Sequence, residues 1–208
     1  MAALKAPILL TGFDAFEGVP ANPSRRVAQA LAGQSVQGSR VHALVLPTVF
    51  ELSRRQLEAT LAALRPRLVL ALGAAPARAA IRVERVAINV DDARIADNAG
   101  RQPIDCPIVA GGPAAYFARL PIKAIVAALR EAGFAAEVSH SAGTFVCNHV
   151  FYALMHALRR RRTVRAGFVH LPVPADAAAA RQEEAVRIAL EVALGVAQDL
   201  PAAGGSVD

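Results

Sequence analysis

The sequence predicts an α/β fold, a single-domain three-layer α/β/α sandwich with a twisted, mainly parallel but mixed sheet. Short β-rich runs alternate along the chain with longer amphipathic stretches rich in Ala, Leu and Arg, which is the pattern of βαβ units with helices on both faces of a sheet. The length of 208 residues fits one domain of ordinary size. With 54% hydrophobic and 19% charged residues, the chain can bury a core and is not expected to be disordered.

The expected strands are short apolar segments bounded by turn residues. The first runs into a Thr-Gly turn, and the third is an unbroken aliphatic run typical of a strand buried on both faces. The fourth contains an acid, Glu84, between Arg82 and Arg85 in an otherwise apolar segment. In chain order the expected strands cover residues 8–11, 41–46, 68–72, 82–89, 136–139 and 165–169.

The expected helices are the amphipathic segments, each of which lies between two strands or closes the chain. The first opens after Asn22 and Pro23, and the fourth follows a turn that contains Gly143. In order they cover residues 24–32, 50–64, 115–131, 145–160 and 177–200. Residues 1–200 are therefore predicted to form one domain. Residues 201–208 are small and Gly-rich and are expected to form a flexible tail.

Residues 91–113 are the longest segment without a clear period, and they contain several Gly and Pro residues. We expect an excursion or an active-site loop there. No segment reaches the roughly 18 apolar residues that a membrane-spanning helix requires. The apolar run at residues 8–10 is too short for a secretory signal. The sequence thus predicts a cytoplasmic protein without a membrane partner.

The net charge of +6 and the pI of about 10.3 raise the hypothesis of a basic nucleic-acid-binding protein. The densest basic run, residues 159–162, falls at the carboxyl end of an expected helix, where cations complement the helix dipole. No aromatic residues are interleaved with it as stacking platforms. We therefore expect no nucleic-acid partner, and binding to DNA at physiological salt would contradict this expectation.

The chain has two cysteines, Cys106 and Cys147, which cannot form a multi-bridge framework. Cys147 lies near the start of the expected helix 145–160. There the partial positive charge of the helix end stabilises a thiolate, and free backbone N–H groups can bind an oxyanion. A nucleophile is one interpretation of Cys147, and a small buried hydrophobe is the other. Cys106 has no helix start beside it.

A reactive thiol usually has a histidine partner from another element of the fold. His170 follows the expected strand 165–169 and so lies at a carboxyl end, where ligands bind in open α/β sheets. His140 follows the preceding strand and is the second candidate. His149 and His156 share the helix of Cys147, and His42 lies at the start of a strand.

Four acids remain open as the partner that orients the histidine: Glu84, Asp91, Asp92 and Asp97. Two phenylalanines in the turn after the first strand, Phe13 and Phe16, suggest the wall of a small apolar pocket. Gly-rich phosphate loops and metal-ligand spacings are absent from the sequence, so we expect no metal and no cofactor.

Several blocks together resemble the pyroglutamyl-peptidase I family. They are TGFD at 11–14 with NPS at 22–24, ERVAIN at 84–89, DARI at 92–95, DN at 97–98, SAGTFVCNH at 141–149 and HLP at 170–172. The block around Cys147 resembles the nucleophile signature of that family. The blocks occur in the order of the family over most of the chain, from about residue 9 to residue 172.

The resemblance implies a cytoplasmic cysteine exopeptidase, an omega peptidase, that hydrolyses the N-terminal pyroglutamyl residue from peptides through a thioester acyl-enzyme and without a metal. It also implies a homo-oligomer, a dimer or tetramer. Carried over by motif, Cys147 is the nucleophile, His170 the base and then the acid, and Glu84 the group that supports the imidazolium. The backbone N–H of Cys147 and the side chain of Arg94 would bind the oxyanion. The residues that would enclose the lactam ring are Phe13, Phe16, Ile95, Phe145 and Val146.

Two loops depart from the pattern of the family. The chain has AFEG at 15–18 where relatives usually have PFGG, and GAAPAR at 73–78 where they commonly have GQAGGR. The glutamine and two glycines are gone from the second loop, and Pro76 removes a backbone donor. We expect an effect on affinity and substrate preference rather than on the chemistry. The altered second loop is the only support for an alternative function, a catalytically silent homologue acting as a binding module.

Overall fold

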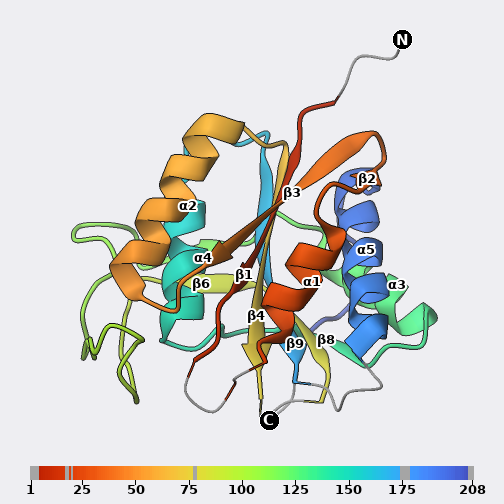
Figure 1. Ribbon diagram of the computed structural model, residues 1–208. Helices are drawn as coiled ribbons and strands as arrows, with labels where there is room; N and C mark the ends of the chain where they lie inside the picture. The colour runs from red at the N-terminus through yellow and green to blue at the C-terminus, as the bar shows by residue number, and fades with distance from the viewer. Residues whose placement is uncertain (1–4, 17–18, 20, 77–78, 174–178, 206–208) are drawn as a thin grey trace.

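A computed structural model of the chain describes residues 5–16, 19, 21–76, 79–173 and 179–205. Over these residues it confirms the predicted α/β fold, with a seven-stranded mixed sheet between two layers of helices (Figure 1). In chain order the elements are β1 (Ile8–Phe13), α1 (Pro23–Leu31), β2 (Ser35–Val36), β3 (Ser39–Leu46), α2 (Phe50–Leu64), β4 (Leu68–Ala75), β5 (Ile81–Glu84), β6 (Val86–Ile88), β7 (Ala115–Phe117), α3 (Ile122–Glu131), β8 (Ala136–Ser139), α4 (Val146–Ala157), β9 (Arg165–Pro172) and α5 (Ala179–Gly195).

The strand order of the main sheet is β2-β3-β1-β4-β9-β5-β8. β1 pairs in parallel with β3 and β4, and β4 pairs in parallel with β9. β5 is antiparallel to β9, which makes the sheet mixed. In this order β9 lies between β4 and β5, and His170 of β9 is opposite Gly73 of β4 and Arg82 of β5. Residues from three distant parts of the chain therefore meet around His170.

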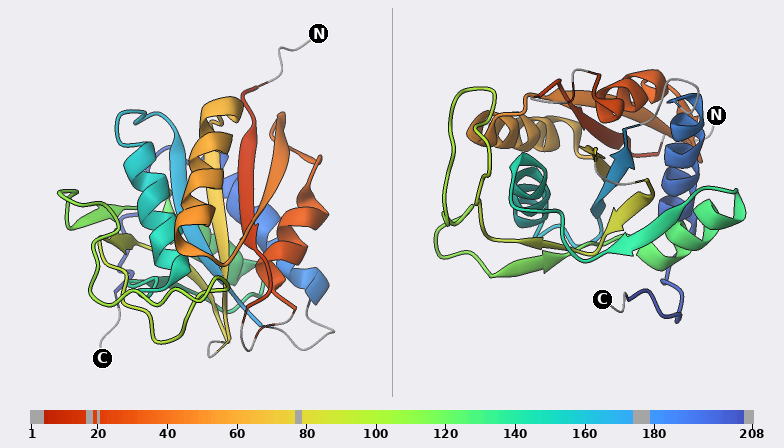
Figure 2. Two further views of the ribbon diagram at one scale, coloured as in Figure 1. Left: turned by 60° about the vertical axis from the view of Figure 1, so that its left-hand side comes forward. Right: turned by 90° about the horizontal axis from the view of Figure 1, so that it is seen from below.

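The helices cover the two faces of the sheet unequally. α2 and α4 pack on one face, and α1, α3 and α5 pack on the other (Figures 1 and 2). The amphipathic pattern of α1 explains its orientation, since Val27, Ala28 and Leu31 are buried against the sheet. Asn22 caps this helix by accepting the backbone N–H of Ser24. Two apolar cores result, one on each side of the sheet, and they hold the strand ends in fixed positions.

The prediction of a single strand over residues 82–89 is wrong. The segment forms β5 in the main sheet and β6 in a separate two-stranded sheet with β7. The change occurs at Arg85, whose N–H donates to the Ser139 carbonyl of β8 while its own carbonyl accepts from the N–H of Ala118. The backbone thus leaves one sheet edge and enters the second ribbon within one residue.

The predicted helix 115–131 is also wrong over its first seven residues. Ala115–Phe117 is the strand β7, and α3 begins at Ile122, directly after Pro121. The residue before a proline is disfavoured in the α region, which separates the two elements. The short strand β2 was not predicted. Its hairpin with β3 turns at Gln37 and Gly38, both at positive φ (47° and 79°), as a two-residue type I′ turn requires.

The last two helices end earlier than predicted, α4 at residue 157 rather than 160 and α5 at 195 rather than 200. The predicted start of α5 at residues 177–178 lies outside the described residues. Residues 201–205 lie beside α3 and β8, where the Gly204 carbonyl accepts from Arg85. The excursion at 91–113 runs along the outside of the α2 and α4 layer (Figure 2, yellow-green). Among the described helices, none combines the length and apolarity needed to cross a membrane.

Candidate active site

A buried histidine and a buried glutamate meet between β9 and β5. His170 Nδ1 lies 2.8 Å from Glu84 Oε1, a distance that fits a ring N–H donating to a carboxylate. Glu84 is fully buried and His170 is 8% exposed. The carboxylate therefore fixes the orientation and the tautomer of the ring. The strand order thus pairs Glu84, and none of the other three acids, with His170.

Cys147 is the second residue of α4, where the predicted helix start is present. Phe145 at the N-cap position has extended backbone and makes no side-chain capping bond, so the first N–H groups of the helix remain available. The Cys147 side chain lies close enough to His170 to raise the pKa of the ring. Its sulfur rests above Gly73 of β4, where an added Cβ would lie 2.9 Å from Sγ. The absence of a side chain at Gly73 therefore leaves room for the Cys147 thiol.

The charge state of His170 follows from its surroundings. Burial disfavours the imidazolium, but hydrogen bonds to Cys147 and Glu84 and the negative charges of these two groups outweigh it and raise the pKa of His170 to about 9. At neutral pH the ring is therefore protonated and poised to donate a proton. It lies between the Cys147 sulfur on one side and the Glu84 carboxylate on the other.

A small apolar pocket opens beside Cys147. Four of the five predicted pocket residues line it, namely Phe13, Phe16, Phe145 and Val146. Three further lining residues, Asn22, Thr48 and Ala74, were not predicted. Thr48 and Ala74 lie at or just beyond the carboxyl ends of β3 and β4, so the strand-end rule that selected His170 could also have found them.

Asp14 fixes the polar rim of this pocket. Its Oδ1 accepts both the backbone N–H and the hydroxyl of Thr48 at 2.7 Å. Its carbonyl accepts from the Asn22 amide at 2.8 Å. Asn98 of the long excursion donates to the Ala15 carbonyl at 2.8 Å. Three loops that follow different elements are thereby held together around the pocket.

Arg94 and Ile95 lie in the excursion after β6. Ile95 is half-buried and is not among the residues lining the pocket. Arg94 is exposed and makes no hydrogen bond or ion pair within the part of the chain that the structure describes. The structure therefore brings Cys147, His170 and Glu84 together, and within the described residues the Arg94 side chain makes no hydrogen bond or ion pair with any of the three.

The other sequence candidates lie elsewhere. His140 is exposed, Asp91 binds His149, and Asp97 accepts the backbone N–H of Phe50. Cys106 is exposed in the excursion. Among the described residues no group of three or more His, Cys, Asp or Glu side chains could hold a metal ion.

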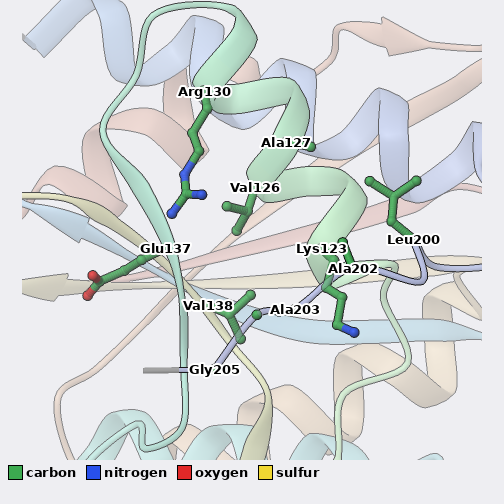
Figure 3. A pocket seen from close by; sticks show the side chains of 11 residues that line it. Lys123, Val126, Ala127, Arg130, Glu137, Val138, Leu200, Ala202, Ala203 and Gly205 are labelled. Carbon is green, nitrogen blue, oxygen red and sulfur yellow. The ribbon is translucent and has the colours of Figure 1, made fainter. Parts of the chain in front are cut away.

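The altered loop 73–78 is described up to Pro76, which is exposed, and Ala77 and Arg78 lie outside the described residues, as do Glu17 and Gly18. A second and larger hollow lies between α3, β8 and the segment 200–205 (Figure 3). Its lining includes Lys123, Arg130 and Glu137 and none of the residues around Cys147. It does not contribute to the site at the strand ends.

The fold and the site define an α/β cysteine hydrolase: a thiol at an uncapped helix start, a histidine and a buried glutamate beside a small apolar pocket. The profile of the family described as "Pyroglutamyl peptidase" matches residues 6–198. The chain belongs to the pyroglutamyl peptidase family, and it is an enzyme, a cysteine peptidase that releases pyroglutamyl residues.

Relatives and solved structures resemble the chain over nearly its whole length. Pyrrolidone-carboxylate peptidase 1 of Ralstonia nicotianae is 53% identical over 96% of this chain and 98% of its own. Pyrrolidone-carboxylate peptidase of Klebsiella pneumoniae is 54% identical over 92% of each chain. The crystal structure of pyroglutamyl peptidase I from Bacillus amyloliquefaciens superposes with a TM-score of 0.91 at 37% identity, covering 96% of this chain and 100% of its own. Pyrrolidone carboxyl peptidase from Thermococcus litoralis has a TM-score of 0.93 at 32% identity, with the same coverage.

Proposed function

We propose that Cys147, His170 and Glu84 form the catalytic triad that hydrolyses the amide bond after an N-terminal pyroglutamyl residue. The observation that carries this proposal is the continuous contact from the Cys147 thiol through the His170 ring to the Glu84 carboxylate, 2.8 Å from the ring. This order of nucleophile, base and orienting acid is the general arrangement of triads for acyl transfer.

The charge state gives the sequence of steps. The Cys147 thiolate attacks the pyroglutamyl carbonyl, and protonated His170 donates its proton to the departing amine, leaving a thioester on Cys147 and a neutral ring. The ring then takes a proton from water, and the resulting hydroxide attacks the thioester. Pyroglutamate leaves, and the thiolate and imidazolium are restored. Glu84 stabilises the imidazolium at both ends of the cycle.

The pocket suits the substrate. A pyroglutamyl residue is compact, neutral and flat, and it has no free α-amino group that would require a carboxylate partner. Phe13, Phe16 and Phe145 offer aromatic surface of this size, and nearly all of the pocket surface is apolar. Because the hollow is small, it accommodates a chain-terminal ring rather than an internal residue, which favours exopeptidase activity.

The oxyanion site is proposed to combine the Cys147 backbone N–H with Arg94. The first N–H groups of α4 are uncapped and point along the helix dipole. Arg94 is exposed and unpaired within the described residues, so its guanidinium is free to reach a developing negative charge. Ile95, beside it, is proposed to complete the pocket wall when substrate is bound.

The test is hydrolysis of a fluorogenic pyroglutamyl amide by the wild type and by two serine variants. Cys147→Ser should lose activity by several orders of magnitude, because a serine hydroxyl is much less acidic than a thiol and does not supply an anionic nucleophile. Cys106→Ser is the matched control, since this thiol is exposed and outside the pocket, and it should keep the wild-type rate. Full activity of Cys147→Ser would remove it as the nucleophile, and an inactive wild type would favour the silent homologue. The comparisons themselves do not support that alternative or a nucleic-acid-binding function.

The remaining expectations are proposals as well. Peptides with an N-terminal pyroglutamyl residue are the proposed substrates. A dimer or tetramer is supported by the apolar side chains of Ile104 and Phe117, each 70% exposed. Sedimentation should show an oligomer at micromolar concentration, and a monomer there would refute it. A cytoplasmic location is supported by two unpaired thiols, since a reducing compartment preserves them.

A further inference from the structure

A second histidine–carboxylate pair lies in the core beside the proposed triad and takes no part in it. His149 Nδ1 is 2.7 Å from Asp91 Oδ2, and the two side chains are 1% and 8% exposed. The remaining polar atoms, His149 Nε2 and Asp91 Oδ1, are buried without a partner in the described part of the chain. A buried pair of this kind costs desolvation and is weak evidence for stability. Its presence therefore calls for another role.

The pair joins the helix of the nucleophile to the start of the long excursion. His149 is two residues after Cys147 on α4, and Asp91 is the residue at which the excursion begins. The neighbouring Asn148 strengthens this junction through two hydrogen bonds to the backbone of Ile88. Its side-chain oxygen accepts the Ile88 N–H at 3.0 Å, and its side-chain amide donates to the Ile88 carbonyl at 2.9 Å. Asn148 also donates to the Val90 carbonyl at 3.1 Å.

The excursion is held on its other side as well. The backbones of Asp91 and Cys106 exchange hydrogen bonds of 2.7 and 3.0 Å. Asp92 is bonded twice to Thr144, the residue two positions before α4: its N–H donates to the Thr144 carbonyl, and its carbonyl accepts the Thr144 hydroxyl at 2.6 Å. The direction in which the chain leaves Asp92 is therefore set by α4. Arg94 follows two residues later.

The same histidine supports the pocket wall. The His149 ring packs edge-on against Phe50 at 5.4 Å, and Phe50 packs edge-on against Phe145 at 5.4 Å. Phe145 lines the pocket. A shift of the His149 ring would thus displace both the start of the excursion and the Phe145 side chain that lines the pocket.

We propose that the Asp91–His149 pair is a positioning pair that fixes Arg94 relative to the Cys147 helix start, so that the guanidinium meets the oxyanion. The inference deepens the proposed function and rests on it. Asp91 and His149 touch no reacting atom. They act through Arg94, so replacing either of them should lower kcat only in a protein that still has Arg94.

The test is a double-mutant cycle on the full chain, with Asp91→Asn, Arg94→Ala and the double variant, using the fluorogenic pyroglutamyl amide. Arg94→Ala should lower kcat by about 100-fold, the lower end for removal of one oxyanion donor. Asp91→Asn keeps the shape and removes the charge, and it should lower kcat on the order of tenfold with KM unchanged, because a displaced donor weakens only the transition state. The double variant should be no slower than Arg94→Ala alone.

Two further readouts separate positioning from damage. Iodoacetamide should alkylate Cys147 at the wild-type rate in Asp91→Asn, because the triad is untouched. His156→Gln is the matched control: His156 lies on the same helix and bonds Tyr116 at 2.9 Å, away from the pocket, and its kcat should equal that of the wild type. His149→Gln is the second variant of the pair and should reproduce the loss in kcat.

Wild-type kcat in both Asp91→Asn and His149→Gln would overturn the proposal. So would additive losses in the double variant, slower alkylation of Cys147, or failure of both variants to fold, which would make the pair structural. An unchanged rate in Arg94→Ala would overturn both the positioning role and the role of Arg94 while leaving the triad intact. Full activity of Cys147→Ser, in contrast, overturns the proposed function itself, so the two failures are distinguishable.

Discussion

Glu84→Gln isolates the contribution of the buried carboxylate to the charge state of His170. Glutamine has nearly the same shape, and its side-chain oxygen can still accept the Nδ1–H at about the position of Glu84 Oε1, 2.8 Å away. Only the negative charge is lost. Because this charge raises the pKa of His170 toward about 9, its removal lowers that pKa, and the alkaline limb of kcat/KM should move to lower pH.

The magnitude follows from the burial of the pair. A hydrogen bond to a charged group contributes about 1.5–3 kcal/mol and one to a neutral group about 0.5–1.5 kcal/mol, so the charge alone accounts for about 1–1.5 kcal/mol, or about one pKa unit. The alkaline limb should therefore move by about one pH unit. The same energy favours the thiolate–imidazolium pair and the protonated ring in the transition state, so kcat/KM at neutral pH should fall by about tenfold.

The assay is the pH–rate profile of the pyroglutamyl amide, measured for the wild type, Glu84→Gln and a matched control. Glu137→Gln is the control, since Glu137 lies on the adjacent strand β8 and pairs with Arg82 at 2.9 Å with 46% of its side chain exposed. An exposed pair of this kind contributes little, and both its rate and its alkaline limb should be those of the wild type. An alkaline limb that stays in place in Glu84→Gln would show that the Glu84 charge does not raise the pKa of His170, whatever the rate.

Three further variants test the glycine beneath the thiol, an aromatic residue of the pocket and the basic run at residues 159–162. Gly73→Ala places a methyl group 2.9 Å from the Cys147 sulfur and 2.8 Å from the Phe168 ring, so kcat should fall by at least about tenfold, and a wild-type kcat would show that the thiol does not lie there. Phe16→Ala removes part of the pocket wall and should raise KM for the amide with kcat little changed; a fall in kcat alone would contradict this. Replacing the arginines at 159–162 by glutamine should leave kcat/KM unchanged, and unfolding by urea should show a stability change within about 0.5 kcal/mol per site.

The sequence predicted the fold class and the helix start beside Cys147 because those signals are local. Aliphatic runs and amphipathic periods mark the main strands and helices, and α4 begins one residue before Cys147. The break at Arg85 was not visible, because β6 is three residues long and pairs with β7 across a loop of 26 residues. Pairing over such distances leaves no periodic signal in either segment.

The choice among the acids could not be made from residue patterns for the same reason. Glu84, Asp91, Asp92 and Asp97 are all acids in or after one expected strand, and only the position of β5 beside β9 selects Glu84. The pairing of His149 with the buried Asp91 was not predicted either. A pair between two elements 58 residues apart is a property of tertiary packing.

The central claim is that Cys147 carries the pyroglutamyl group between the two halves of the reaction. The most direct measurement is rapid acid quenching of the enzyme during turnover of a pyroglutamyl ester, followed by peptide mapping by mass spectrometry. The peptide that contains Cys147 should gain the mass of one pyroglutamyl group, and the same peptide of Cys147→Ser should gain none. The same group found on Cys106 or on another residue, with Cys147 unmodified, would contradict it.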